Sequence, residues 1–232
     1  MARKKIVFVI VEGPSDEQAL GVMLNRIYDN ETVYIHIMRK DITTERGNML
    51  VKIGDVIRSY ANSNHFTKSD FKEIIHIVDM DGAYIPNDNI VEDMSAECPR
   101  YSVTEIRTRN KLGIEKRNLQ KSSNINWLCS CKEIWGVPYR IFYMSCNLDH
   151  VLYNKLNSTD EEKEDDSFKF AIKYKEKISE FLTFISASDF SVVCGYKESW
   201  EFIKKDLHSL ERHTNLGLCF QNDEVTEQNP TN

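Results

Sequence analysis

The sequence predicts an α/β fold: a mostly parallel four-stranded sheet flanked by helices. Two observations predict it. Short runs rich in Val and Ile alternate with longer segments whose apolar residues recur every three or four positions. The first run, residues 5–11, is apolar from Ile6 onward, which is typical of a strand buried on both faces by parallel neighbours and helices.

The first half of the chain predicts strand, helix, strand, helix and strand in that order. Gly13 and Pro14 indicate a turn after the first strand, and Ser15 is a suitable N-cap for the helix that follows. Strands that alternate with helices in this way form parallel sheets with right-handed crossovers. The expected elements are strands at 5–11, 32–38 and 73–78, a helix from Ser15, and a helix at 49–60.

The second half is less regular. Residues 83–109 show no sustained period and predict an extended loop, and the charged run 158–166, which lacks apolar residues, predicts a solvated loop. The polar residues 223–232 predict a flexible tail. The other expected elements are a helix within 113–131, a strand at 139–144, a short helix at 147–156, and amphipathic helices at 168–185 and 200–210.

Bulk composition excludes several classes of protein. The net charge of −6 argues against a surface that binds nucleic acid all over, although a local basic face remains compatible with it. No apolar stretch approaches the roughly 20 residues of a membrane helix, so no membrane partner is expected. The six cysteines are dispersed, which favours reduced thiols and a cytoplasmic protein.

Carboxylates follow the ends of two predicted strands. Glu12 follows the first strand, and Asp79 and Asp81 follow the third. Ligands of parallel α/β sheets bind beyond the carboxyl ends of the strands, and like charges gathered there require a cation. Oxygen ligands favour Mg²⁺ or Mn²⁺, as one or two ions. We expect both aspartates to point the same way along an extended backbone, with Met80 in the core and Gly82 allowing a turn.

The residues 11–16, Val-Glu-Gly-Pro-Ser-Asp, precede an apolar helix, and Asp79-Met-Asp81 follows a later hydrophobic strand. This pattern resembles the Toprim fold of topoisomerases, bacterial primases, small ribonucleases and the OLD (overcoming lysogenization defect) nucleases. The spacing of Glu12 and Asp16 is more similar to the OLD group, and the resemblance covers roughly residues 5–156. It implies that Glu12, Asp79 and Asp81 serve metal-dependent phosphoryl chemistry. Asp16 would join them as a catalytic and metal-binding residue, or would only cap its helix.

Residues 144–152 extend the resemblance to stand-alone OLD-like Toprim proteins. A turn with Ser and Asn follows a strand, and Asp149 then opens an apolar helix. The position of Asp149 implies a further metal ligand, although the family more often has Glu there. Capping of the helix by Asn147 or Asp149 explains the same residues equally well.

The resemblance implies a Mg²⁺- or Mn²⁺-dependent endonuclease, a phosphodiester hydrolase for DNA or RNA, acting in phage defence or restriction. Full OLD proteins include an ATPase, whereas these residues contain no Gly-x-x-x-x-Gly-Lys-Ser/Thr motif. Control by ATP would therefore require an ATPase partner protein. Two alternatives are a non-catalytic Toprim subunit that regulates or binds nucleic acid, and an unrelated α/β phosphatase that reuses the Asp-x-Asp turn. The oligomeric state is open.

A basic segment interrupts the acidic chain. Residues 100–140 contain nine Lys or Arg and three Glu, a net charge of +6. This asymmetry fits a face that binds phosphates beside the metal site, and a solvated helix face explains it equally well. The candidates for nucleic-acid contacts are Lys116, Arg117 and Lys121, which have helical spacing, with Arg109 and Lys111.

These observations divide the chain into three parts. Residues 1–156 form a Toprim-like catalytic domain that includes the basic insertion at about 84–137. Residues 157–222 form a helical extension packed on that domain, and residues 223–232 form the tail.

Overall fold

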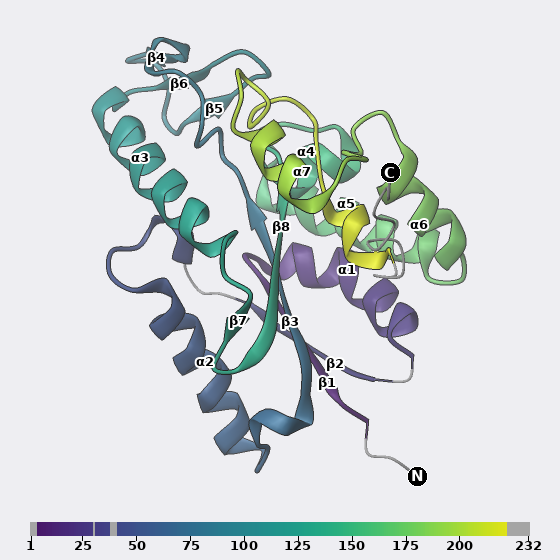
Figure 1. The fold of residues 1–232 in the computed structure, drawn as a ribbon. Helices are drawn as coiled ribbons and strands as arrows, with labels where there is room; N and C mark the ends of the chain where they lie inside the picture. Colours follow the sequence, from purple (N-terminus) through teal and green to yellow (C-terminus); the bar gives the residue numbers. More distant parts are fainter. Residues whose placement is uncertain (1–3, 30, 38–40, 222–232) are drawn as a thin grey trace, which may run out of the picture.

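The computed structural model describes residues 4–29, 31–37 and 41–221. Within these ranges a five-stranded sheet with the order β2-β1-β3-β8-β7 is covered by helices on both faces (Figure 1). The four strands β2, β1, β3 and β8 are parallel, which confirms the predicted class. An unpredicted edge strand, β7, pairs antiparallel with β8. The strands are β1 Ile6–Val11, β2 Thr32–Ile37, β3 Phe71–Asp79, β7 Glu133–Ile134 and β8 Val137–Met144.

The apolar strand β1 supplies two cores at once. All six of its residues are buried. Phe8 and its even-numbered neighbours pack with α2 (Met49–Ser63) and α3 (Lys111–Leu128). Val9 and its odd-numbered neighbours pack with α1 (Pro14–Ile27). The period of two in a strand therefore explains why this run is apolar throughout.

The later helices complete the same two cores. Helices α4 to α6 join α1 on one face of the sheet, whereas α7 joins α2 and α3 on the other. The C-terminal helices thus pack on the sheet without a core of their own. Their bounds are α4 Leu148–Tyr153, α5 Asp160–Tyr174, α6 Ile178–Ala187 and α7 Tyr196–Ile203. Short 3₁₀ helices lie at η1 Ile42–Thr44, η2 Lys68–Asp70, η3 Asn87–Asn89 and η4 Leu216–Phe220.

The prediction of a loop at 158–166 is wrong, because most of this acidic run forms the start of α5. The Thr159 hydroxyl accepts a hydrogen bond from the Glu162 N–H at 3.2 Å, and the Glu162 carboxylate accepts one from the Thr159 N–H at 2.8 Å. Acidic side chains are favourable at the positive end of the helix dipole, so this charge suits a helix start. The single helix predicted at 168–185 is two helices, with a break between Tyr174 and Ile178.

The loop predicted at 83–109 contains a second, three-stranded sheet in the order β4-β6-β5. With Ile114 and Leu210, its residue Ile106 forms a third, smaller core. This sheet lies at the top of Figure 1, near the carboxyl ends of the main strands. Strands of two or three residues are too short to show alternation, so the pattern could not predict them. They are β4 Ile90–Glu92, β5 Arg100–Tyr101 and β6 Ile106–Thr108.

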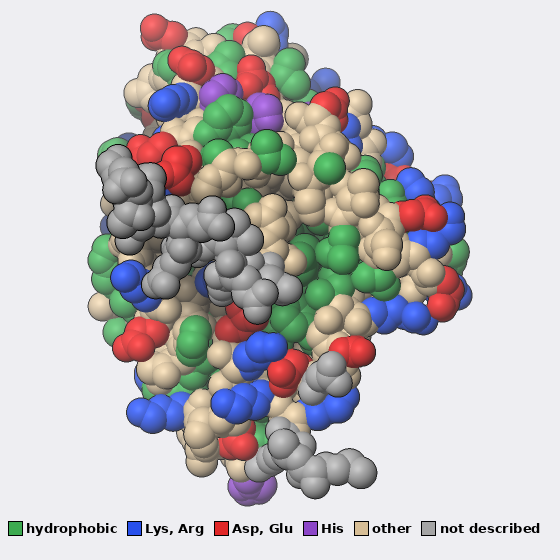
Figure 2. Space-filling view, turned by 45° about the vertical axis from the view of Figure 1, so that its right-hand side comes forward, with side chains coloured by type: hydrophobic (Ala, Val, Ile, Leu, Met, Phe, Trp, Pro, Cys, Tyr) green, Lys and Arg blue, Asp and Glu red, His purple; other side chains and the backbone are tan. Residues whose placement is uncertain are grey.

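An apolar hollow of about 750 Å³ lies between α1, β2 and α5. Its lining includes Val22, Phe168 and Ile172, whose side chains are exposed. Figure 2 shows hydrophobic side chains gathered on the side of the molecule that carries α1, α5 and α6. The hollow shares no lining residue with the acidic cavity described below.

In the part of the chain that the structure describes, no helix is long and apolar enough to cross a membrane. All six cysteines are free thiols. The tail predicted at 223–232 and the last residue of the second predicted strand, Met38, lie outside the described residues.

Candidate metal centre

The four parallel strands end at one edge of the sheet, and an acidic residue follows or closes each of them. Glu12 follows β1, Asp41 precedes η1 beyond β2, Asp79 closes β3, and Asp149 lies in α4 beyond β8. This edge is where ligands of parallel α/β sheets bind. The fold therefore gathers carboxylates from four separate connections.

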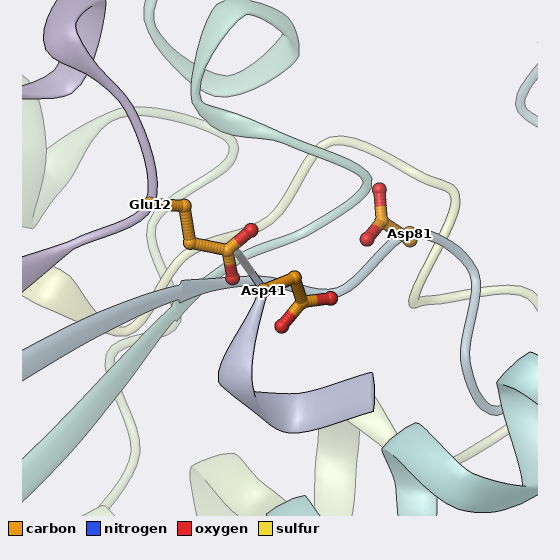
Figure 3. A group of neighbouring side chains, drawn as sticks. All are labelled: Glu12, Asp41 and Asp81. Atoms are coloured by element: carbon orange, nitrogen blue, oxygen red, sulfur yellow. The ribbon is translucent and has the colours of Figure 1, made fainter. Parts of the chain in front are cut away.

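Three of these carboxylates form a compact group. Glu12, Asp41 and Asp81 each offer an oxygen, and these oxygens lie within 4.8 Å of one another. In Figure 3 the carboxylates of Glu12 and Asp81 point toward the space between them, and Asp41 enters that space from the start of η1. Three oxygens at this spacing could hold a hard divalent cation. We call this group the acidic triad.

Asp41 was not predicted as part of the site. It lies four residues beyond the end of β2, and its carboxylate also accepts a hydrogen bond from the N–H of Thr43 at 2.8 Å. Glu12 and Asp79 were identified as acidic residues that directly follow predicted strands, and Asp41 follows the second strand at a greater distance. Extending the search a few residues into the connection after the second strand would have identified this residue.

Lys121 of α3 reaches into the acidic triad. Its Nζ lies 2.8 Å from Asp41 Oδ2, 2.5 Å from Asp81 Oδ2 and 4.0 Å from Glu12 Oε1, and its side chain is 0% exposed. Burial lowers the pKa of Lys121, but the three carboxylates more than offset this and raise the pKa well above its usual value. Lys121 is therefore a permanent positive charge inside the triad.

A cavity of about 260 Å³ lies on the other side of Glu12. Besides Glu12, its acidic lining includes Asp16, Asp79 and Asp149, and we call it the acidic cavity. Among the described residues, no Lys, Arg or His forms an ion pair within 4.0 Å of Asp16, Asp79 or Asp149. Lys163 of α5 lines the cavity without such a contact. The triad side of the site thus has a lysine in direct contact with its carboxylates, whereas Lys163 lies in the lining of the cavity without an ion pair to Asp16, Asp79 or Asp149.

Backbone N–H groups hold the cavity carboxylates in place. Asp16 accepts hydrogen bonds from the N–H groups of Glu12 at 3.2 Å and Gly13 at 3.0 Å. Glu12 accepts one from Asp79 at 3.0 Å, and Asp79 accepts one from Leu148 at 3.0 Å. These bonds join the ends of β1 and β3 to the starts of α1 and α4.

Asp16 caps its helix and also lines the cavity. The N-cap of α1 is Gly13 and not Ser15, so the predicted cap is wrong by two residues. The reason is Pro14, whose fixed φ suits the first helical position and whose missing N–H costs nothing there. This start places Asp16 at the third helical position, where its side chain reaches back to the turn.

Asp79 and Asp81 do not point the same way, contrary to the sequence prediction. The extended backbone ends at Asp79, and Asp81 has a φ of 48°, in the left-handed region. The change of direction sends Asp79 to the acidic cavity and Asp81 to Lys121. Met80 is buried and Gly82, with a φ of 68°, continues the turn, as predicted.

Burial raises the pKa of four carboxyls that line the acidic cavity. The pKa of Glu12 rises to about 8, and that of Asp16 to about 6. The pKa of Asp79 lies well above its usual value, and that of Asp149 is also raised. In each case burial outweighs the nearby positive charges, which include Lys121 for Glu12 and Lys163 for Asp16 and Asp149.

Asp41, on the triad side, is shifted the other way. Burial alone would raise its pKa, but Lys121 and the hydrogen bonds from Thr43 lower it. The two sides of Glu12 therefore differ electrostatically, because Lys121 contacts the triad carboxylates directly, while Lys163 lies in the cavity lining without such a contact.

The helical spacing of Arg117 and Lys121 predicted that both lie on a face that binds phosphates. The structure instead turns both side chains inward. Arg117 donates hydrogen bonds to the Tyr101 hydroxyl at 2.5 Å and to the Asp81 carbonyl at 2.7 Å, and Lys121 is buried. The spacing of four residues correctly places both on one helix face. That face is turned toward the end of the sheet.

The other three candidates for nucleic-acid contacts are more accessible. Lys116 and Arg109 are exposed, and Lys111 is half-buried at the first position of α3. Arg109 donates to the carbonyl of Met94 at 3.1 Å. Lys116 and Arg109 thus belong to the exposed basic residues of the segment 100–140.

Comparison of the chain with protein-family models, with curated proteins and with solved structures finds no match.

Proposed function

We propose that the protein is a Toprim-type nuclease that uses Mg²⁺ or Mn²⁺ to hydrolyse phosphodiester bonds in DNA or RNA. The observation that carries the proposal is the gathering of six carboxylates at the edge of the sheet. In the part of the chain that the structure describes, Lys121 is the one cationic side chain that forms an ion pair within 4.0 Å with any of these carboxylates. So many like charges require further cations. The six are Glu12, Asp16, Asp41, Asp79, Asp81 and Asp149.

The residues of the acidic cavity fit a hard divalent cation. They offer carboxylate oxygens, which Mg²⁺ and Mn²⁺ prefer, and backbone N–H groups orient Glu12, Asp16 and Asp79. A bound cation would lower the pKa of an attacking water and stabilise the leaving oxygen. The raised pKa values of Glu12 and Asp16 fit groups that release protons when a metal binds.

The basic segment 100–140, with its net charge of +6, supports a polyanionic substrate. Its helix α3 and the small sheet lie near the carboxyl ends of the main strands (Figure 1). Lys116 and Arg109 are exposed there, and Lys163 lines the acidic cavity from α5. Cations around an acidic metal site can hold the phosphate backbone and offset charge that develops during cleavage.

The biological setting is proposed on resemblance alone. The spacing of Glu12 with Asp16 and of Asp79 with Asp81 is similar to that of OLD nucleases. We therefore propose a role in phage defence or restriction, beside an ATPase partner protein.

The test is a cleavage assay on supercoiled plasmid, single-stranded DNA and tRNA, each with Mg²⁺, Mn²⁺ or EDTA. We expect metal-dependent cleavage of at least one substrate by the wild-type protein. Asp79→Asn and Asp16→Asn keep the hydrogen-bonding oxygen but remove the charge, so both should abolish cleavage. Asp55→Asn, at an exposed position on α2, is the control and should cut normally.

Other results would favour the alternatives. Cleavage that persists in Asp79→Asn would refute the proposed site. Binding of nucleic acid without cleavage in any metal would identify a non-catalytic subunit. Hydrolysis of a phosphomonoester through a trapped phospho-aspartate would identify a phosphatase.

A further inference from the structure

The Lys121 ammonium occupies the place that a cation would take in the acidic triad. Its Nζ contacts Asp41 Oδ2 at 2.8 Å and Asp81 Oδ2 at 2.5 Å. A Mg²⁺ ion bonded to the same oxygens at about 2.1 Å would lie against this ammonium. Two positive charges that close together repel strongly in a buried site. Lys121 and a divalent ion therefore exclude each other from the triad.

Lys121 is held in this position by its own helix. Asn118 donates a hydrogen bond to the Gly82 carbonyl at 3.0 Å, and Asn124 donates one to the Thr43 carbonyl at 2.7 Å. These bonds join α3 to the two connections that carry Asp81 and Asp41. Because the Lys121 side chain is also 0% exposed, it can reach solvent only if the elements packed around it move.

The acidic cavity has the opposite character. It is a hollow of about 260 Å³, and no ion pair within 4.0 Å neutralises its aspartates among the described residues. Asp149 lines it with only 4% of its surface exposed. Glu12 contributes to both sides, since its Oε1 lies 4.0 Å from Lys121 and its side chain also borders the cavity.

We propose that the protein takes a single divalent cation, in the acidic cavity, and that Lys121 stands in place of a second one in the acidic triad. Two-metal phosphodiester enzymes place two ions about 3.5–4 Å apart, one for each reacting oxygen. Here the second positive charge is a compact ammonium, built into the fold through α3. The inference rests on the metal site of the proposed function but does not require that the protein cuts nucleic acid.

The test counts Mn²⁺ ions bound to the full chain, by isothermal titration and by electron paramagnetic resonance of free Mn²⁺. We expect one Mn²⁺ per wild-type chain. Asp149→Asn should weaken its binding about tenfold or more, whereas Asp41→Asn should change it only a few-fold. Asp55→Asn is the control and should bind as the wild type does.

The variant Lys121→Met directly tests whether the Lys121 ammonium stands in place of a second metal ion. It leaves the acidic triad without its cation, so we expect a second Mn²⁺ per chain and a larger rise of the unfolding temperature with Mn²⁺ than in the wild type. If this variant does not fold, the wild-type count and the two asparagine variants decide the question without it.

Two results would overturn the inference: two Mn²⁺ per wild-type chain, or equal losses of affinity in Asp41→Asn and Asp149→Asn. The absence of any Mn²⁺ binding would overturn the metal site as a whole. One bound Mn²⁺ in a protein that cuts no substrate would support the inference and reject the nuclease function, so the two failures are distinguishable.

Discussion

The carboxylate of Glu12 accepts a hydrogen bond from the backbone N–H of Asp79 at 3.0 Å, which ties the end of β1 to the end of β3. The same side chain lies 4.0 Å from Lys121 and borders the acidic cavity. Glu12 is therefore the group shared by both sides of the site, and its charge and its hydrogen bond can be tested separately.

Glu12→Gln should separate them, because glutamine keeps an oxygen that accepts the Asp79 N–H but carries no charge. We expect the affinity for Mn²⁺ to fall about tenfold or more. We expect no loss of stability in EDTA. Glu12→Ala also loses the hydrogen bond and should be less stable than Glu12→Gln by about 1 kcal/mol. Titration calorimetry and urea unfolding measure the two effects, and equal stability of the two variants would contradict the role of the hydrogen bond.

The stability of the metal-free protein should fall as the pH rises from 4.5 to about 8. Burial raises the pKa of Glu12 from 4.5 to about 8, so in this range the folded state binds more protons than the unfolded state. The free energy of unfolding then decreases with pH. Asp16, whose pKa is raised to about 6, adds to this decrease in stability in the lower part of the pH range. Urea unfolding in EDTA across this range measures it, and Glu12→Gln should show a shallower decrease.

The binding of a divalent cation should have the opposite dependence on pH. Mn²⁺ competes with the protons on Glu12 and Asp16, so its affinity should increase over the same range. The rise of the unfolding temperature on adding Mn²⁺ should therefore be larger at pH 8 than at pH 6. A stabilisation that does not change with pH would place the metal away from these two carboxyls.

Much of the main sheet could be predicted, because burial on both faces leaves a local signal. β1 is apolar at every position, and the spacing in α1 follows the helical period. The two- and three-residue strands of the insertion have too few positions to show a pattern. The start of α5 was missed because a charged run indicates both a loop and a helix N-terminus, and only the Thr159–Glu162 capping decides between them.

The site was predictable where it depends on strand ends. Glu12 and Asp79 lie at strand ends, so the order of elements placed them at the same edge, and the pairing of β1 with β3 in the structure brings them into contact. The contact of Lys121 with Asp41 joins residues 80 positions apart, and no local pattern reports it. Helical spacing groups Lys121 with Arg117 but does not tell whether their shared face meets solvent or carboxylates.

Gly82→Ala should destabilise the turn that separates Asp79 from Asp81. Gly82 has a φ of 68°, and an added Cβ would lie 2.8 Å from Leu210 Cδ2. We expect a loss of about 1–3 kcal/mol in the free energy of unfolding. Gly54→Ala is the control, because Gly54 lies in α2 and its added Cβ would meet only the flexible end of Arg58. That variant should gain about 0.5–1 kcal/mol. Urea unfolding compares them, and equal effects would contradict the strain argued for Gly82.

Lys116→Ala should weaken the binding of nucleic acid without weakening the fold. Lys116 is exposed on α3, so its loss removes about one phosphate contact and should reduce the slope of log affinity against log salt by about 0.7 for single strands. Binding is measured in EDTA, where the proposed cleavage does not occur. Lys169→Ala on α5 removes the same charge from an exposed side chain and should leave the slope unchanged. Equal slopes for both variants would mean that the positive charge of residues 100–140 belongs only to a solvated surface, the alternative that the sequence leaves open.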